Sequence, residues 1–272
     1  MQKKTFSLIT IIMLIFLIVL IYYKQFDNND KYTKRIPVLM YHNVVDKDIL
    51  KHYTKKEYQK IFISTDKFEQ QMKFIKTNNY KTLTLDEFYD FVQGNKNLPQ
   101  KCVLITFDDG RKNLYVKAYP ILKKYNLNAV SFIITSKISK QSEEYNPLKW
   151  QYLSESELEK GKDVFEYASH THDMHKRSKN TQKPYLKIKS EKEIKEDIQK
   201  SLKYVDNPYF AYPYGSYTNN IKKILQEAGI KAAFTTKKGK VSINDSLYDL
   251  KRYGISEKTT NNQFAKILGV KN

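Results

Sequence analysis

The chain centres on the segment Cys102-Val103-Leu104-Ile105-Thr106-Phe107-Asp108-Asp109-Gly110. Its apolar and β-branched run, bounded by Pro99 and Gly110, is typical of a strand buried on both faces of a parallel sheet. Asp108 and Asp109 follow where this strand ends. Two neighbouring side chains can point into one cleft at such a turn, and like charges that close resist double ionisation unless a cation lies beside them. The alternative is that the pair caps a helix that begins near Arg111.

Histidines gather after two other apolar runs. Three of the 5 histidines lie in Ser169-His170-Thr171-His172-Asp173-Met174-His175, directly after the run at residues 164–168, and His42 follows the run at residues 36–41. Histidines and carboxylates at strand ends are the ingredients of a metal site with an open position. A lone histidine is more often a structural hydrogen-bonding group, but such a cluster seldom is. The histidines therefore favour a metal site over helix capping.

These motifs resemble those of the polysaccharide deacetylases of carbohydrate esterase family 4. Within that family the chain is most similar to the branch that acts on poly-β-1,6-N-acetylglucosamine, a biofilm polymer, as the staphylococcal intercellular adhesion deacetylase does. The spacing of five residues between His170 and His175 favours this branch, as does the early Met40-Tyr41-His42. The resemblance covers about residues 36–256 and rests on residues 106–110, residues 170–175 and Phe210-Ala211-Tyr212-Pro213-Tyr214-Gly215.

Predicted strands alternate with predicted helices along the chain. The connections are too long for hairpins, which predicts a parallel β/α barrel or a doubly wound sheet. Helix starts are indicated by a serine or threonine followed three residues later by glutamate, at Thr84, Ser154 and Ser190. The resemblance implies a distorted (β/α) barrel of about seven strands. Candidate site residues lie at the C-terminal ends of predicted strands: His42, Asp108, Asp109, His170 and Tyr212. In β/α folds the face formed by these strand ends builds the active site.

The N-terminus predicts a membrane anchor. Lys3 and Lys4 precede residues 6–23, which carry no charge and have about the length that spans a bilayer, roughly 17–25 residues. Basic residues before the span favour a cytoplasmic N-terminus. We expect a cytoplasmic segment at 1–5, a signal-anchor at 6–23, an extracellular tether at 24–35 and a catalytic domain at 36–272. The alternative is a cleaved signal peptide and a secreted, surface-associated protein, although the chain lacks a small-residue cleavage site there.

Composition limits the partners. The 272 residues are 40% hydrophobic, enough for one sizeable core. With 48 Lys and Arg against 29 Asp and Glu, the net charge of +19 predicts association with an anionic cell envelope or membrane surface. Nucleic acid is not an expected partner, because the charge is spread along the chain without a basic-aromatic motif. The single cysteine, Cys102, excludes an intramolecular disulfide, and we expect a monomer.

The resemblance also implies a role for each site residue. Asp109, His170 and His175 would hold a divalent metal, Asp108 would act as the base, and His42 would give a proton to the leaving amine. A set of two histidines and one carboxylate suits Zn²⁺, and also Co²⁺, Ni²⁺ or Fe²⁺. The implied reaction is hydrolysis of the N-acetyl group on a glucosamine unit of the polymer.

Two positions depart from the family pattern. Ala211 stands where most members carry the arginine that orients the base, and Arg252 is the candidate replacement, the alternative being a surface arginine. His172 lies between the predicted ligands, with metal binding or cleft lining as possible roles. Asp173 is a candidate either to orient a ligand histidine through its second nitrogen or to cap a turn.

Aromatic side chains near the third motif are candidates for contact with sugar rings. They are Tyr212, Tyr214 and Trp150, with Pro213 shaping the turn that aims Tyr214. Alternatives to the leading function are an N-deacetylase of peptidoglycan or chitin oligomers, an O-acetyl esterase, and a non-catalytic module that binds wall polysaccharide.

Overall fold

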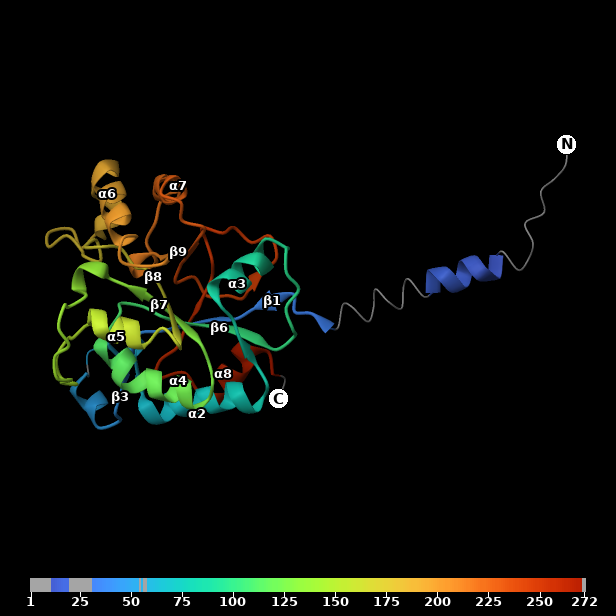
Figure 1. The fold of residues 1–272 in the computed structure, drawn as a ribbon, viewed down its shortest axis with the longest axis horizontal. Helices are drawn as coiled ribbons and strands as arrows, with labels where there is room; N and C mark the ends of the chain where they lie inside the picture. Colours follow the sequence, from blue (N-terminus) through green and yellow to red (C-terminus); the bar gives the residue numbers. More distant parts are fainter. Residues whose placement is uncertain (1–10, 20–30, 54, 56–57, 271–272) are drawn as a thin grey trace.

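A computed structural model of the chain describes residues 11–19, 31–53, 55 and 58–270. Its main feature is a curled, parallel sheet with helices around it (Figure 1). In spatial order the strands of the sheet are β10 (Ala232–Phe234), β9 (Asn207–Ala211), β8 (Phe165–Ser169), β7 (Ala129–Ile133), β6 (Cys102–Phe107), β2 (Val38–Tyr41) and β12 (Tyr253–Gly254). Every neighbouring pair along this path is parallel, so the predicted β/α architecture is confirmed.

The barrel is open rather than closed. Between the two end strands, β10 and β12, the structure describes no ladder; an isolated bridge from Phe234 to Leu250 and a few backbone hydrogen bonds, such as that from Arg252 N to Lys237 O, link the residues next to the two edges. The remaining strands form three short pairings. β5 (Lys81–Thr82) pairs with β6, β1 (Arg35–Ile36) pairs with β11 (Val241–Ser242), and β3 (Asn43–Val45) pairs with β4 (Phe62–Ser64).

Seven α-helices pack around the sheet within the part of the chain from residue 31 to residue 270. The predicted helix starts are confirmed, because capping boxes at Thr84, Ser154 and Ser190 begin three of them. A π-helical turn, η3 (Leu114–Ala118), leads into the helix that contains Pro120. The helices are α2 (Thr65–Thr77), α3 (Leu85–Val92), α4 (Tyr119–Lys124), α5 (Glu155–Lys160), α6 (Glu191–Ser201), α7 (Asn219–Glu227) and α8 (Asn261–Leu268).

Strand side chains alternate between two faces of the sheet. In β6, Val103, Ile105 and Phe107 share a cluster with side chains of α2, α4 and α8. Cys102 and Leu104 point the other way, into a cluster with α3. We call the face of Cys102 and Leu104 the inner face. Figure 1 shows α2, α4 and α8 together on one side of the molecule and α6 and α7 together on the opposite side.

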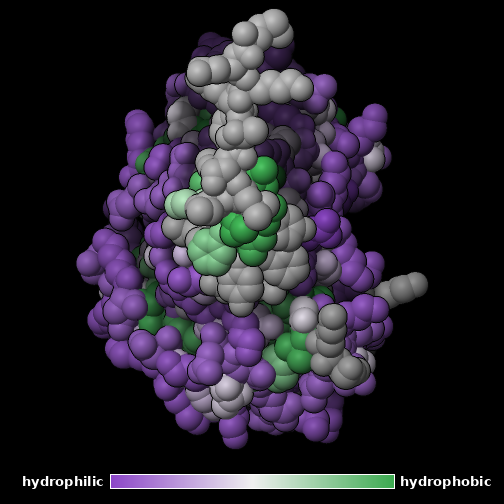
Figure 2. Space-filling view, turned by 90° about the vertical axis from the view of Figure 1, so that its right-hand side faces the viewer, coloured by the Kyte–Doolittle hydropathy of each residue, from purple (hydrophilic) through white to green (hydrophobic). Residues whose placement is uncertain are grey.

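The predicted membrane anchor is only partly described. Residues 11–19 are helical, and their hydrophobic side chains are exposed, from 47% at Ile11 to 68% at Met13. The predicted cytoplasmic segment 1–5 and residues 6–10 and 20–30 lie outside the described residues. Within the described ones, no helix is both long and apolar enough to cross a membrane. Figure 2 views the molecule from the side on which the helix of residues 11–19 projects in Figure 1. Hydrophilic residues cover most of this face, and hydrophobic ones gather near its centre.

Candidate metal centre

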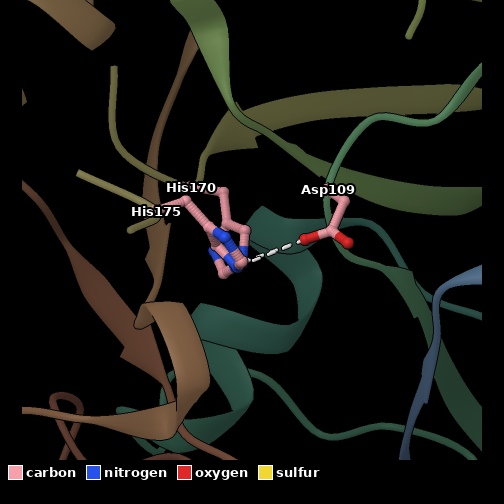
Figure 3. A group of neighbouring side chains, drawn as sticks. All are labelled: Asp109, His170 and His175. Atoms are coloured by element: carbon pink, nitrogen blue, oxygen red, sulfur yellow. Dashed lines mark ion pairs between the residues drawn. The ribbon is translucent and has the colours of Figure 1, made fainter. Parts of the chain in front are cut away.

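Three predicted ligands converge at the carboxyl end of the sheet. His170 follows β8 directly, Asp109 lies in the turn after β6, and His175 ends the loop that begins at His170. The Nε2 atoms of His170 and His175 lie 3.7 Å and 3.3 Å from Oδ1 of Asp109. Figure 3 shows the two imidazole rings side by side, both facing the carboxylate. The structure thus brings together the three side chains that the sequence picked out as ligands.

The turn after β6 needs a glycine to deliver Asp109. Asp109 and Gly110 both have positive φ, 76° and 67°. A Cβ atom at Gly110 would lie 2.1 Å from Cγ2 of Ile133 on β7. Two more residues near the centre have the same left-handed backbone conformation: Thr171, in the loop after β8, with φ of 75°, and Tyr214, in the turn after β9, with φ of 59°. Non-glycine residues there are strained, and such strain typically collects at functional sites.

His170 presents a free lone pair to the centre, and the ring of His175 is neutral as well. Nδ1 of His170 lies 2.7 Å from the carbonyl oxygen of Ala211, and because a carbonyl only accepts, Nδ1 carries the proton and Nε2 does not. Burial lowers the pKa of His170, and burial together with the neighbouring His170 lowers the pKa of His175 to about 4. Both rings are therefore neutral near pH 7, the form that binds a metal.

Asp109 completes a donor set that fits a divalent cation. Burial alone would raise its pKa, but His175, His42 and Arg111 outweigh this and lower it, so the carboxyl group is ionised. Its Oδ1 atom is buried and has no hydrogen-bond donor among the described residues. A buried, unpartnered carboxylate oxygen close to the Nε2 atoms of two neutral imidazoles is a donor set for a divalent metal such as zinc. Cobalt, nickel and ferrous iron suit the same donors.

Asp108 is held by Arg252. The guanidinium donates from Nη1 to Oδ1 at 2.7 Å and from Nη2 to Oδ2 at 2.8 Å, and its Nε donates to the carbonyl oxygen of Thr235. Arg252 is 0% exposed, so the alternative of a surface arginine is wrong. Burial alone would raise the pKa of Asp108, but Arg252 and His170 lower it far below its usual range.

His42 lies beside Asp108 and outside the group of three. Its Nε2 atom is 4.0 Å from Oδ2 of Asp108, and its side chain is 17% exposed. Nδ1 of His42 is buried and lacks a hydrogen-bond partner within the described chain. This position leaves the ring free to exchange a proton with a group bound in the cleft, and the predicted role as proton donor stays a prediction.

Tyr212 does not face the cleft, and the prediction that it packs against a sugar ring is wrong. The side chain is 0% exposed, its hydroxyl donates to the carbonyl oxygen of Tyr248, and its ring stacks on Tyr217 at 4.7 Å. It belongs with Phe210 to the cluster packed by α6 and α7. Pro213 is buried too, at the start of the 3₁₀ turn η6 (Pro213–Gly215), so its contribution is to the turn.

His172 and Asp173, which lie between the ligand histidines, have structural partners. Asp173 accepts hydrogen bonds from Ser136 and Lys176, so the prediction that it orients a ligand histidine is wrong, and Ala211 fills that role for His170. Nδ1 of His172 lies 2.9 Å from Oγ1 of Thr135. His172 is not part of the group that could hold a metal.

Tyr214 reaches the centre, as predicted. Its ring centroid lies 4.5 Å from that of His175, its hydroxyl donates to the His175 carbonyl oxygen, and 38% of the residue is exposed. Trp150 is 42% exposed, and one face of its indole is covered by a guanidinium group, that of Arg111. Both residues are partly exposed, and their contact with a sugar ring stays a prediction.

Arg111 is a site residue that sequence reasoning missed. Its Cζ atom lies 4.2 Å from the ring centroids of both Trp150 and Tyr152, and its Nη2 atom lies 3.6 Å from Oδ2 of Asp109. The signal available in the sequence was its place directly after Gly110, since a residue that follows a strand-end turn stays on the same face of the sheet.

Comparison with known proteins places the chain among the deacetylases. The sequence profile of the polysaccharide deacetylase family matches residues 95–233. The poly-beta-1,6-N-acetyl-D-glucosamine N-deacetylase of Staphylococcus aureus (strain MRSA252) is 34% identical over 80% of this chain and 78% of its own length. The enzyme of that name from Staphylococcus epidermidis is 32% identical over 83% of this chain and 81% of its own.

Solved structures agree in fold. The deacetylase PplD of Streptococcus pyogenes, in complex with acetate, superposes with a TM-score of 0.73 at 25% identity, covering 86% of this chain and 98% of that one. The structure of IcaB from Ammonifex degensii superposes with a TM-score of 0.71 at 24% identity, covering 88% and 97% of the two chains. The curled sheet is thus the fold of solved deacetylases.

Proposed function

The chain belongs to the polysaccharide deacetylase family, and on that basis we propose that it removes N-acetyl groups from poly-β-1,6-N-acetyl-D-glucosamine. The staphylococcal relatives support the choice of polymer, because their names state this activity. The observation that carries the proposal is the meeting of Asp109, His170 and His175 within 4.8 Å, beside the Asp108 carboxylate. A protein that only binds polysaccharide has no need of such a set.

The reaction is hydrolysis of an amide. A divalent metal held by Asp109, His170 and His175 would supply a Lewis acid at the acetyl group. Asp108, kept ionised by Arg252, accepts a proton from the attacking water, whose oxygen bonds to the acetyl carbon. The C–N bond then breaks, and His42 donates a proton to the departing nitrogen, which releases acetate and a glucosamine unit.

Arg252 fixes the position of the catalytic base, Asp108, and does not make it more basic. A carboxylate whose pKa is held this low binds a proton weakly, so its contribution depends on geometry. The two parallel hydrogen bonds fix both oxygens of Asp108, and correct placement of a catalytic group supplies a large share of rate enhancement in general. His42, 4.0 Å away, then completes a pair of groups that can take and give a proton.

The proposed location is the outer surface of the cell membrane. Residues 6–23 would anchor the chain, with the tether and catalytic domain outside. The uncharged composition of that segment and the exposed, apolar helix at residues 11–19 support this. The net charge of +19 supports added contact with anionic envelope components. Mass spectrometry of the native protein tests the anchor: an intact N-terminus is expected, and a mature N-terminus near residues 25–35 would contradict it.

Acetate release from defined oligomers tests the activity. We expect the metal-loaded protein to release acetate from β-1,6-linked N-acetylglucosamine oligomers much faster than from β-1,4-linked oligomers of equal length. Asp108→Asn is the matched inactive control, since the amide cannot accept the proton. Equal or faster release from β-1,4 oligomers would indicate peptidoglycan or chitin-like substrates instead, and binding without release would indicate a non-catalytic module.

A further inference from the structure

Two arginines lie next to the candidate metal centre, one beside Asp109 and the other beside His175. Arg111 approaches on the side of Asp109, with Nη2 3.6 Å from Oδ2. Arg177 approaches on the side of His175, with Cζ 4.1 Å from the ring centroid of Tyr214, the ring that lies against His175. One guanidinium group thus lies against a predicted metal ligand, and the other lies against the ring that covers a second predicted ligand.

Both charges are fixed in place. The Arg111 guanidinium is enclosed by Trp150 and Tyr152 at 4.2 Å from each ring. The backbone holds this arrangement, since Lys112 N donates to Gln151 O at 3.1 Å. On the other side, Nη1 of Arg177 donates to the carbonyl oxygen of Gln182 while its guanidinium covers Tyr214. Cations stacked on aromatic rings gain stability from the ring face, which disfavours their moving away.

Neither charge is neutralised by an exposed carboxylate within the described chain. The ion-pair partner of Arg111 is the buried Asp109, whose other oxygen faces the histidines. Arg177 has a backbone oxygen as its polar partner. A third cation, Lys137, lies 6.0 Å from the ring centroid of Tyr152. Arg177 therefore brings a positive charge to the neighbourhood of His175 that no carboxylate of the described chain pairs, whereas the charge of Arg111 is shared with Asp109.

The substrate and product of the proposed reaction differ in charge. An N-acetylglucosamine unit is neutral, whereas a deacetylated unit carries a basic amine, part of which is protonated near neutral pH. We infer that Arg111 and Arg177 make the enzyme select against stretches of polymer that already contain deacetylated units, so that deacetylation limits itself to spaced units. This inference rests on the proposed function and adds the substrate pattern that the same site accepts.

The size of the effect follows from Coulomb's law. Like charges about 8 Å apart repel enough to change a rate by roughly twofold, if the screening is that of bulk water, to roughly thirtyfold, at the lower effective dielectric constant of a protein surface, for each arginine. The repulsion acts through solvent at the mouth of the cleft, so salt must weaken it; the screening length falls from about 10 Å at 0.1 M to about 3 Å at 1 M. A purely steric preference would not respond to salt in this way.

Competition between two pentasaccharides tests the inference. One is fully acetylated β-1,6-linked N-acetylglucosamine, and the other has one interior unit deacetylated beforehand. We expect the full-length, metal-loaded enzyme to prefer the first in kcat/KM, and expect this preference to shrink at 1 M salt. Arg177→Gln is expected to reduce the preference by roughly two- to thirtyfold, and Arg111→Gln similarly, with bound metal measured because Arg111 adjoins Asp109.

Lys101→Gln is the matched control. It removes the same charge just before β6, about 20 Å along the strand from Phe107 at the usual rise per residue, and is expected to leave the preference unchanged. Equal kcat/KM for both oligomers in the wild type, or an unchanged preference in both arginine variants with metal retained, would overturn the inference while leaving the deacetylase activity standing. Absence of acetate release from both oligomers would overturn the proposed function and the inference together.

Discussion

Arg252 and Asp108, 144 residues apart in the chain, form a buried ion pair with two parallel hydrogen bonds of 2.7 Å and 2.8 Å. One partner follows β6 and the other immediately precedes β12, so the pair ties the strand that carries the base to the open edge of the sheet. In most members of the family, by resemblance, the equivalent arginine comes from the third motif, where this chain has Ala211. The same contact is thus reached from a different part of the chain.

Replacing Arg252 by methionine should be strongly destabilising. Removal of one partner leaves the Asp108 carboxylate buried and uncompensated, which typically costs about 3–5 kcal/mol. Urea unfolding of Arg252→Met checks this, and acetate release should fall with it. The double variant Asp108→Asn with Arg252→Met should be more stable than Arg252→Met alone, because no buried charge remains. Wild-type stability in Arg252→Met would show that the pair does not carry this energy.

His42 and His170 should respond differently to the same substitution. His170→Ala removes a nitrogen that faces Asp109, so bound metal and acetate release should both be lost. His42→Ala should retain the metal and lose turnover, because His42 lies beside Asp108 and outside the group of three. Metal content by atomic absorption, measured with acetate release, separates the two. Equal metal loss in both variants would make His42 a ligand or a structural residue.

Gly110→Ala should cost more than Gly229→Ala. Both glycines have positive φ, 67° and 80°, but a Cβ at Gly110 meets Ile133 at 2.1 Å, whereas nothing lies within 4 Å of one at Gly229. Gly229→Ala therefore carries only the backbone penalty, about 1 kcal/mol. Gly110→Ala adds the clash, typically 1–3 kcal/mol, and should also reduce bound metal by displacing Asp109. Similar unfolding energies for the two variants would contradict this account of the turn.

The buried pair of Lys112 and Glu157 should make stability depend on pH. Burial alone would raise the pKa of Glu157, but hydrogen bonds from Lys112, Ser154 and Ser142 outweigh it and lower the pKa. A folded pKa below the unfolded value, about 4.3 for glutamate, means that the pair stabilises the fold above that pH and ceases to do so as the pH falls through the lowered folded value.

Glu157→Gln tests this pH dependence. The free energy of unfolding of the variant should be lower than that of the wild type at pH 7, and the difference should shrink as the pH falls below about 4. Urea unfolding at both ends of this range provides the measurement. A difference that stays constant with pH would mean that the carboxylate charge is not what stabilises the loop after β6.

Most of the site could be predicted from the positions of the strand ends, because the carboxyl ends of parallel strands lie at one edge of the sheet. Where the prediction failed, side-chain alternation gives the reason. In β9, Tyr209 and Ala211 point to the inner face and Phe210 to the other, so Tyr212, one step beyond the strand, falls with Phe210. The same count along β6 puts Asp108 with Leu104 on the inner face, where Arg252 reaches it.

Packing between segments far apart in the chain decides the contacts of Arg111 and Asp173, which could not be predicted from the sequence. The place of Arg111 directly after Gly110 puts it at the strand-end face, but its guanidinium is held there by the loop that carries Trp150 and Tyr152, which folds back across the turn. No local pattern near Arg111 indicates that contact. Asp173 shows the converse: it has the expected residue type and spacing for orienting a ligand, yet Ser136 and Lys176 occupy it.

The most direct test of the central claim is a metal titration of the chelator-stripped, full-length protein, with acetate release from purified poly-β-1,6-N-acetylglucosamine followed at each step. The account predicts that stripped protein is inactive and that release returns in proportion as one equivalent of a divalent ion such as Zn²⁺ binds, but not in Asp109→Ala. Acetate release that persists in the stripped protein, or a fully active Asp109→Ala variant, would contradict it.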